Sequence, residues 1–218
     1  MRREAVIEAI DEHKVFAIVR GLKPKQVRPT MEALHAGGIR LVEVTFDRVN
    51  GDASTLQALQ VLQEEFSDKL IYGAGTVTST EQVAQVNALG GSFIVSPDCN
   101  VGVIGATREA QMVSLPGVLT ATEAVVAHDA GADFIKLFPG GVFGPGYLKA
   151  LAAPLSDLKF IAVGGVDEHN IAEFAKAGAA GFGIGSNLVN NSMVEANDFD
   201  TIYNNARTFK QAIDSIRK

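Results

Sequence analysis

The sequence predicts an α/β protein with a single-domain (β/α)8 TIM barrel and an N-terminal amphipathic helix. Eight short apolar runs follow one another along the chain, and most are continuous rather than alternating, which is typical of parallel strands buried on both faces. Each run is followed by a turn and a helical stretch, and no linker divides the chain. Division of 218 residues by eight units leaves about 27 residues per unit, enough for one strand, one helix and two short loops.

The first element predicted is the N-terminal helix, MRREAVIEAIDEHK, in which Val6, Ile7 and Ile10 recur at helical spacing among charges. It has no apolar core of the kind found in a signal peptide. The eight strands then follow in order, at residues 15–20, 40–46, 70–76, 92–97, 112–118, 133–139, 158–165 and 180–186. One domain over residues 1–218 is expected, and an open doubly wound sheet is the alternative architecture.

Helix boundaries between these strands carry local signals. Helix starts are predicted at Pro24, at Asp167 and at two S/T-x-x-E capping boxes, Thr78 with Glu81 and Thr120 with Glu123. Helix ends are predicted at four glycines in left-handed conformation, Gly37, Gly90, Gly131 and Gly178.

Composition excludes several partners and compartments. A net charge of −6 and a pI near 5.2, without basic clusters, argue against nucleic acid or an anionic membrane as the main partner. No window approaches the ~18 apolar residues of a membrane span. Cys99 is the single cysteine, which excludes an intramolecular disulfide framework and a multi-cysteine zinc site. We therefore expect a cytoplasmic protein.

Two ionisable residues lie inside apolar runs, Lys136 in FIKLF and Glu43 in LVEVT. Burial should lower the pKa of the lysine, which makes its neutral amine available to form a Schiff base with a carbonyl group. Burial should likewise raise the pKa of the glutamate, which suits a residue that moves protons. The alternative for both residues is a structural ion pair, or a lysine that reaches out to solvent.

Glycine-rich turns end the seventh and eighth runs and suggest a phosphate site. Gly164 and Gly165 follow Val163, and Ser186 lies in a GIGSN turn. Such turns let backbone N–H groups approach an anion, and barrels bind phosphate at these ends. The turn around Thr76 is similar, although that residue could simply lead into a helix.

Arg20 ends the first run and places a guanidinium at the barrel mouth, where a substrate carboxylate or phosphate is its natural partner and a surface ion pair is the alternative. The four histidines fall in helical or loop segments, and strand ends supply no other clustered ligands. No metal and no other cofactor is expected.

Six motifs follow one another along nearly the whole chain: LVEVT (41–45), GAGTV (73–77), SP (96–97), FIKLFP (134–139), VGGV (163–166) and GS (185–186). In order and spacing they resemble the 2-keto-3-deoxy-6-phosphogluconate (KDPG) and 4-hydroxy-2-oxoglutarate (KHG) aldolase family, class I pyruvate aldolases that include the phosphogalactonate enzyme. The resemblance implies a homotrimer that cleaves a phosphorylated keto acid to pyruvate and an aldehyde, which is glyceraldehyde 3-phosphate for the sugar acids and glyoxylate for hydroxyoxoglutarate.

The resemblance also implies roles for individual residues. Lys136 would form the Schiff base and Glu43 would act as acid and base. Arg20 and Thr76 would hold the pyruvate carboxylate, and Pro97 and Phe138 would shape the pocket. Gly164, Gly165 and Ser186 would bind phosphate.

Two positions depart from the family pattern. Several relatives have an arginine where this chain has Asp47, and Arg48 one residue later is left out of the predicted site. Val163 stands where gluconate-type members tend to have threonine. The valine is closer to the galactonate-type members, and the stereochemistry of the substrate stays open. A phosphosugar isomerase or epimerase and a non-catalytic barrel that binds a phosphorylated ligand are the rival functions.

Overall fold

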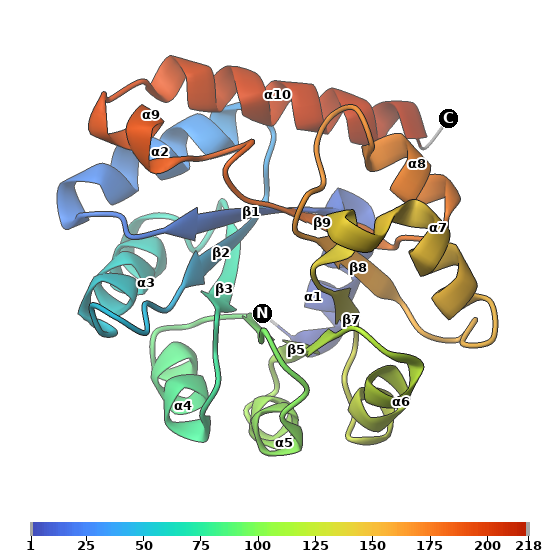
Figure 1. The fold of residues 1–218 in the computed structure, drawn as a ribbon. Helices are drawn as coiled ribbons and strands as arrows, with labels where there is room; N and C mark the ends of the chain where they lie inside the picture. The colour runs from blue at the N-terminus through green and yellow to red at the C-terminus, as the bar shows by residue number, and fades with distance from the viewer. Residues whose placement is uncertain (1, 217–218) are drawn as a thin grey trace.

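The computed structural model describes residues 2–216 and confirms the predicted barrel. Nine parallel strands lie in the order β5-β4-β3-β2-β1-β9-β8-β7-β6 and curl into a nearly closed barrel with helices around it (Figure 1). The strands are β1 (Val15–Arg20), β2 (Leu41–Thr45), β3 (Ile71–Gly75), β4 (Phe93–Val95), β5 (Val113–Leu115), β6 (Gly117–Val118), β7 (Ile135–Leu137), β8 (Phe160–Val163) and β9 (Gly181–Ile184).

The fifth predicted strand differs from the sequence expectation because it is split at Pro116. Its first half, β5, pairs with β4, and its second half, β6, pairs with β7. Proline has no N–H to donate, so a regular ladder is interrupted there. The carbonyl of Pro116 still accepts a hydrogen bond from the backbone N–H of Lys136 at 2.9 Å. One continuous run of chain, residues 112–118, therefore joins the two sides of the barrel, and the repeat count stays at eight.

Helices follow the strands in chain order and surround the barrel (Figure 1). They are α1 (Arg3–His13), α2 (Pro24–Ala36), α3 (Ala53–Glu65), α4 (Thr80–Ala88), α5 (Val101–Glu109), α6 (Ala121–Asp129), α7 (Gly140–Ala152), α8 (Ile171–Lys176), α9 (Asn191–Glu195) and α10 (Phe199–Ile216). Within residues 2–216, none of them combines the length and apolar character that crossing a membrane requires.

The helix signals are confirmed at two starts and corrected at two others. Pro24 begins α2, and Thr120 with Glu123 forms the capping box of α6. The cap of α4 is Ser79 rather than Thr78, because the Ser79 hydroxyl accepts the hydrogen bond from the first turn. Asp167 does not begin α8, whose N-cap is Asn170.

The carboxylate of Asp167 instead accepts hydrogen bonds from the backbone N–H groups of His169 and Asn170, at 3.0 and 2.9 Å, so it stabilises the turn that precedes α8. Among the predicted helix ends, Gly90, Gly131 and Gly178 have positive φ angles. The fourth expectation is wrong by one residue, since Gly37 has φ −73° and the left-handed position is Gly38.

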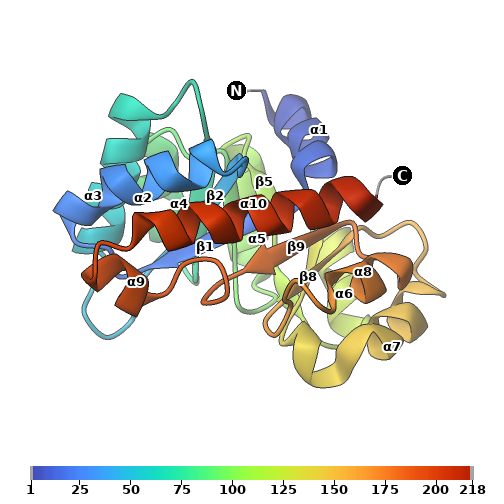
Figure 2. The ribbon, with the colours of Figure 1, turned by 90° about the horizontal axis from the view of Figure 1, so that it is seen from above.

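The N-terminal helix closes the barrel at the end where the strands begin (Figure 2). Val6 and Ile10 are buried in the same apolar cluster as Phe16 and Phe93, whose rings meet edge to face at 5.2 Å inside the barrel. This burial confirms that the helix is amphipathic and leaves the barrel interior open mainly at the opposite end.

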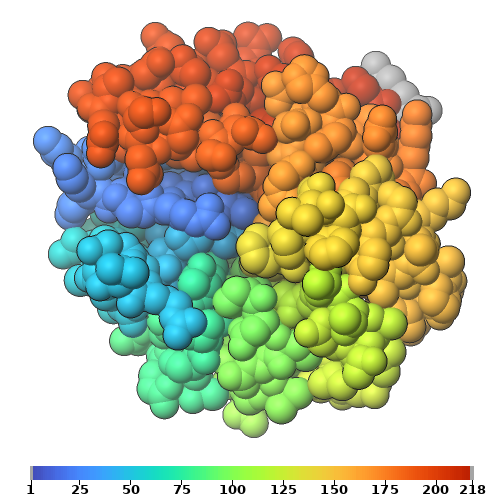
Figure 3. Space-filling model, viewed as in Figure 1, coloured from blue at the N-terminus to red at the C-terminus, as the bar shows by residue number. Residues whose placement is uncertain are grey.

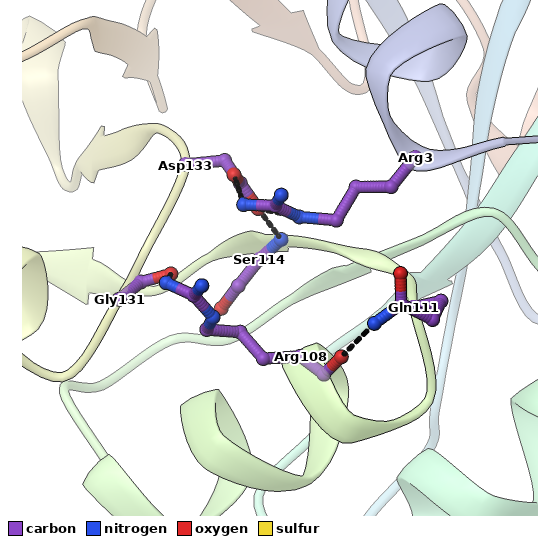
Figure 4. A network of polar contacts seen from close by, with 6 residues as sticks. All are labelled: Arg3, Arg108, Gln111, Ser114, Gly131 and Asp133. Carbon is purple, nitrogen blue, oxygen red and sulfur yellow. Dashed lines mark hydrogen bonds and ion pairs between the residues drawn. The ribbon is translucent and has the colours of Figure 1, made fainter.

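Polar contacts fix α1 in this position (Figure 4). Arg3 forms an ion pair with Asp133, which precedes β7, and Asp133 also accepts a hydrogen bond from the backbone N–H of Ser114 at 2.9 Å. At the other end of the helix, Lys159 Nζ lies 2.6 Å from Asp11 Oδ2. Both contacts join the helix to the segments that lead into the neighbouring strands β7 and β8.

Candidate active site

Two buried ionisable side chains face each other across the barrel interior. Glu43 lies in the middle of β2 and Lys136 in the middle of β7, with three strands between them in one direction and the β3, β4 and β5–β6 segments in the other. The two residues are only 3% and 6% exposed. They line one small cavity, whose other walls are Phe16, Val95, Leu115, Ile161, Val163 and Gly183.

Burial shifts both groups toward their neutral forms, as the sequence predicted. Desolvation raises the pKa of Glu43, and the positive charges of Lys136 and Arg20 partly oppose it. Desolvation lowers the pKa of Lys136, and the Glu43 carboxylate is the largest opposing influence. The cavity therefore holds an amine that readily loses its proton beside a carboxyl group that readily takes one up.

A second, more open pocket of about 220 Å³ adjoins the inner cavity, since Val163 and Gly183 line both. It lies at the carboxyl ends of β1, β8 and β9, on the face shown in Figure 3, where segments from blue to orange surround a common centre. Five predicted substrate-binding residues line it: Arg20, Phe138, Gly164, Gly165 and Ser186.

The glycine pair has a conformation that needs glycine. Gly164 and Gly165 have φ angles of +84° and +78°, in the left-handed region. A Cβ on Gly164 would lie 3.0 Å from the Phe138 ring, and one on Gly165 would lie 3.0 Å from the Cα of Gly141 at the start of α7. The pair therefore has no side chains of its own, and its backbone lines the pocket beside the Phe138 ring.

The two remaining predicted residues, Thr76 and Pro97, line neither cavity. Thr76 directly follows β3 at the same end of the barrel and has φ +58°, a left-handed conformation that is rare for a β-branched residue. Pro97 follows β4, and its carbonyl group lies against Gly117. A Cβ built on Gly117 would lie 2.5 Å from the carbonyl oxygen of Pro97. Both residues are at the mouth, but the structure does not bring them to the walls of the two cavities.

Residues near the mouth that the sequence did not single out include Asn187, which lines the second pocket and donates a hydrogen bond to the Val166 carbonyl at 3.3 Å. Its position in the turn after the eighth run was the available signal. Arg48 is exposed in a turn held by Asp47, whose carboxylate accepts hydrogen bonds from the N–H groups of Val49 and Asn50. Over residues 2–216, no group of three or more His, Cys, Asp or Glu side chains could hold a metal ion.

Comparison with known proteins identifies the family. A family model described as "KDPG and KHG aldolase" matches residues 6–205. The chain belongs to this aldolase family. As a member of it, the protein is a lyase, and the resemblance seen in the six motifs is confirmed.

Similar curated proteins carry two substrate names. A 2-dehydro-3-deoxy-6-phosphogalactonate aldolase of Escherichia coli (strain K12) is 38% identical over 175 residues, which are 80% of this chain and 83% of that protein. A 2-dehydro-3-deoxy-phosphogluconate aldolase of Treponema pallidum is 32% identical over 201 residues, 90% of this chain and 92% of that protein.

Solved structures of the family have the same fold. One described as "Native KDPGal structure" has a TM-score of 0.85 and 35% identity, and the match covers 93% of this chain and 95% of that one. The KDPG aldolase of Legionella pneumophila, in which pyruvate was captured as a covalent carbinolamine, has a TM-score of 0.84 and 27% identity, with 95% and 97% covered.

Proposed function

We propose that this aldolase cleaves a 2-keto-3-deoxy-6-phospho sugar acid to pyruvate and glyceraldehyde 3-phosphate through a Schiff base on Lys136. The observation that carries the proposal is the cavity shared by Lys136 and Glu43, which adjoins a pocket lined by two glycine turns. The first provides a nucleophile and a proton carrier, and the second provides backbone for an anion. Hydroxyoxoglutarate would react at the same lysine to give pyruvate and glyoxylate.

The reaction follows from the chemistry of a buried amine. The neutral Lys136 amine adds to the C2 keto group, and loss of water gives a protonated imine. Removal of the C4 hydroxyl proton then breaks the C3–C4 bond, the aldehyde leaves, and the bonding electrons remain on the imine carbon skeleton as an enamine. Protonation at C3 and addition of water release pyruvate and regenerate the amine. Glu43 moves the protons in these steps.

The remaining predicted residues hold the two anionic ends of the substrate. Gly164, Gly165 and Ser186 bind the phosphate, which their shared pocket supports. Arg20 and Thr76 hold the carboxylate. Support for Arg20 comes from its charge, which affects the pKa values of both Glu43 and Lys136 and so acts close to the reacting carbon. Phe138 and Pro97 shape the pocket.

One residue, Val163, favours the galactonate epimer over the gluconate epimer as the substrate. Val163 lines both cavities and offers no hydroxyl group to a substrate hydroxyl. The 38% identical relative named for phosphogalactonate agrees with this preference. Side-by-side kcat/KM values for the two epimers and for hydroxyoxoglutarate decide the ranking.

Chemical trapping tests the mechanism. Borohydride added with pyruvate should reduce the imine and add a pyruvate-derived mass to the peptide that contains Lys136, and Lys136→Met should lose both the adduct and activity. A lactate-dehydrogenase-coupled assay should show pyruvate release from the sugar acid. An isomerase or a non-catalytic binding barrel would give no adduct and no pyruvate, and an unmodified peptide would therefore overturn the proposal.

We further propose that the protein is a homotrimer, as the family resemblance implies. Apolar side chains on neighbouring helices are exposed, Val125 and Val126 on α6 and Val142 and Phe143 on α7. Contiguous exposed apolar side chains mark interaction surfaces. Light scattering should give about 69 kDa, three times the 23.0 kDa of one chain, and a mass of 23.0 kDa would contradict the trimer.

A further inference from the structure

We infer that Gly75 is a positioning residue whose missing side chain leaves the space in which the Glu43 carboxylate lies. Gly75 is the last residue of β3, and a Cβ built on it would lie 1.7 Å from Glu43 Oε1. The same Cβ would lie 2.5 Å from Cδ and 2.7 Å from Cγ of Glu43. These separations are far inside van der Waals contact, so the observed carboxylate position and a side chain at residue 75 exclude each other.

The strand register shows that this contact is not simply one between paired residues. Glu43 pairs with Gly73, and Thr45 pairs with Gly75. The Glu43 side chain therefore extends about two residues along the barrel, from its own level toward the carboxyl ends of the strands. It reaches the level of the mouth only because the inner face of β3 is empty at Gly75.

The two inward glycines of β3 serve different neighbours. A Cβ on Gly73 would lie 2.1 Å from the backbone carbonyl oxygen of Phe93 and 2.6 Å from its ring, so this glycine accommodates the neighbouring strand β4 and its apolar side chain. Ala74, between them, faces the surrounding helices and belongs to the outer apolar cluster. Only Gly75 accommodates an ionisable group, which separates a role in the site from a general need for small residues in this strand.

The inference rests on the proposed role of Glu43 as proton carrier. A methyl group at residue 75 would force the carboxylate to move by more than about 1 Å, and displacements of that size at a reacting group cost on the order of 10²-fold in rate. Lys136 lies on strand β7, across the barrel from β3, and all three atoms nearest to a Cβ at residue 75 belong to Glu43, so the extent to which Lys136 forms a Schiff base at equilibrium should persist.

Exchange of the pyruvate methyl protons with D₂O isolates the proton-transfer step. Lys136 forms the imine, a base removes a C3 proton to give the enamine, and a deuteron returns to C3 before hydrolysis. Gly75→Ala should slow this exchange, followed by NMR, on the order of 10²-fold, while the yield of the borohydride-trapped pyruvate adduct stays near the wild-type value. Gly105→Ala in α5, where no atom beyond the neighbouring helix backbone lies within 4 Å of the new Cβ, is the matched control and should exchange at the wild-type rate.

A stability comparison tests the contact itself and does not depend on catalysis. Gly75→Ala should lower Tm by roughly 4 to 10 °C in the wild-type background, because the new methyl overlaps the Glu43 side chain. In an E43A background, which removes all three contacting atoms, the same change should cost less than about 2 °C. If Gly75→Ala does not fold in the wild-type background, its recovery by E43A gives the same answer.

Equal Tm losses in both backgrounds, or wild-type exchange by folded Gly75→Ala, would overturn the inference. The proposed function fails in a different way. Glu43→Gln that exchanges protons at the wild-type rate would remove the acid–base role of Glu43, whatever the coupling between residues 43 and 75.

Discussion

The Nζ atom of Lys136 lies 4.9 Å from the centre of the Phe138 ring. The two residues are two positions apart at the end of β7, so both side chains lie on the same side of the strand. The face of an aromatic ring attracts a positive charge, by about 0.5 kcal/mol when exposed and about 2 kcal/mol when desolvated. Phe138 also lies against Gly164, so the ring connects the amine with the glycine turn.

Phe138→Leu should slow the reaction while leaving the fold intact. Leucine keeps an apolar surface but removes the ring that stabilises the positive charge on the amine and on the imine derived from it. We expect kcat to fall by roughly 2- to 30-fold, which corresponds to the energy range of such contacts. Steady-state kinetics with the sugar acid measure the effect. Phe138→Tyr, which keeps the ring, serves as the control, and an unchanged kcat in Phe138→Leu would remove this role.

The pH profile of Schiff-base formation should depend on Glu43. The amine attacks only when neutral, so the rate falls as pH drops through the pKa of Lys136, which burial lowers and the Glu43 carboxylate raises. Glu43→Gln removes that negative charge, so the pKa of Lys136 decreases and the acid limb should move to lower pH. The initial rate at which the borohydride-trapped adduct forms, measured against pH, gives the position of the acid limb in the wild type and in the variant. Glu64→Gln on the exposed face of α3 should leave the limb in place.

Replacing both buried ionisable groups should stabilise the fold at the expense of activity. The variant Lys136→Met with Glu43→Leu removes two desolvated groups, and replacement of buried charged groups by hydrophobic side chains of similar volume is neutral or stabilising by about 1–4 kcal/mol. Urea unfolding measures the difference in the free energy of unfolding. A double variant less stable than the wild type at every pH would contradict the expectation.

The sign of its pH dependence follows from the two shifts. Because the pKa of Glu43 is raised above 4.5, wild-type stability decreases as pH rises from that value through the folded pKa. Because the pKa of Lys136 is lowered below 10.5, wild-type stability increases as pH rises from the folded pKa toward 10.5. The advantage of the double variant should therefore be largest between the two folded pKa values.

Val163→Thr should shift preference between the two sugar-acid epimers. The side chain is 5% exposed and lines both cavities, and threonine keeps its shape while adding a hydroxyl group. We expect the kcat/KM ratio of gluconate to galactonate substrate to rise by roughly 10- to 100-fold, because a buried hydroxyl discriminates by hydrogen bonding. Val163→Ala removes bulk without adding a donor and should leave the ratio near its starting value. A ratio unaffected by threonine would assign specificity elsewhere.

The sequence predicted the barrel because its apolar runs are strong and regularly spaced, and the interruption at Pro116 is the main departure. A proline within the run was the signal for that break. Capping residues were less decisive, since Thr78 and Ser79 are adjacent and both can cap, and only the backbone geometry selects Ser79.

The candidate site could be predicted where polarity stands out against an apolar strand, as it does at Lys136 and Glu43. The contact of Glu43 with Gly75 could not be predicted in this way. It depends on the register between β2 and β3 and on the direction in which a long side chain extends, and neither is encoded in the local pattern. Likewise, the sequence placed Thr76 at the mouth but could not show that its backbone is left-handed.

The N-terminal helix closes the end of the barrel at which the strands begin. Val6 and Ile10 pack into that end, and the cavity of Lys136 adjoins the pocket of the glycine turns through Val163 and Gly183. In the proposed reaction, pyruvate is bonded to the lysine at the inner end, and the phosphorylated aldehyde occupies the passage outside it. The products should therefore be released in a fixed order, aldehyde before pyruvate. Slow release of the aldehyde would then also delay the release of pyruvate.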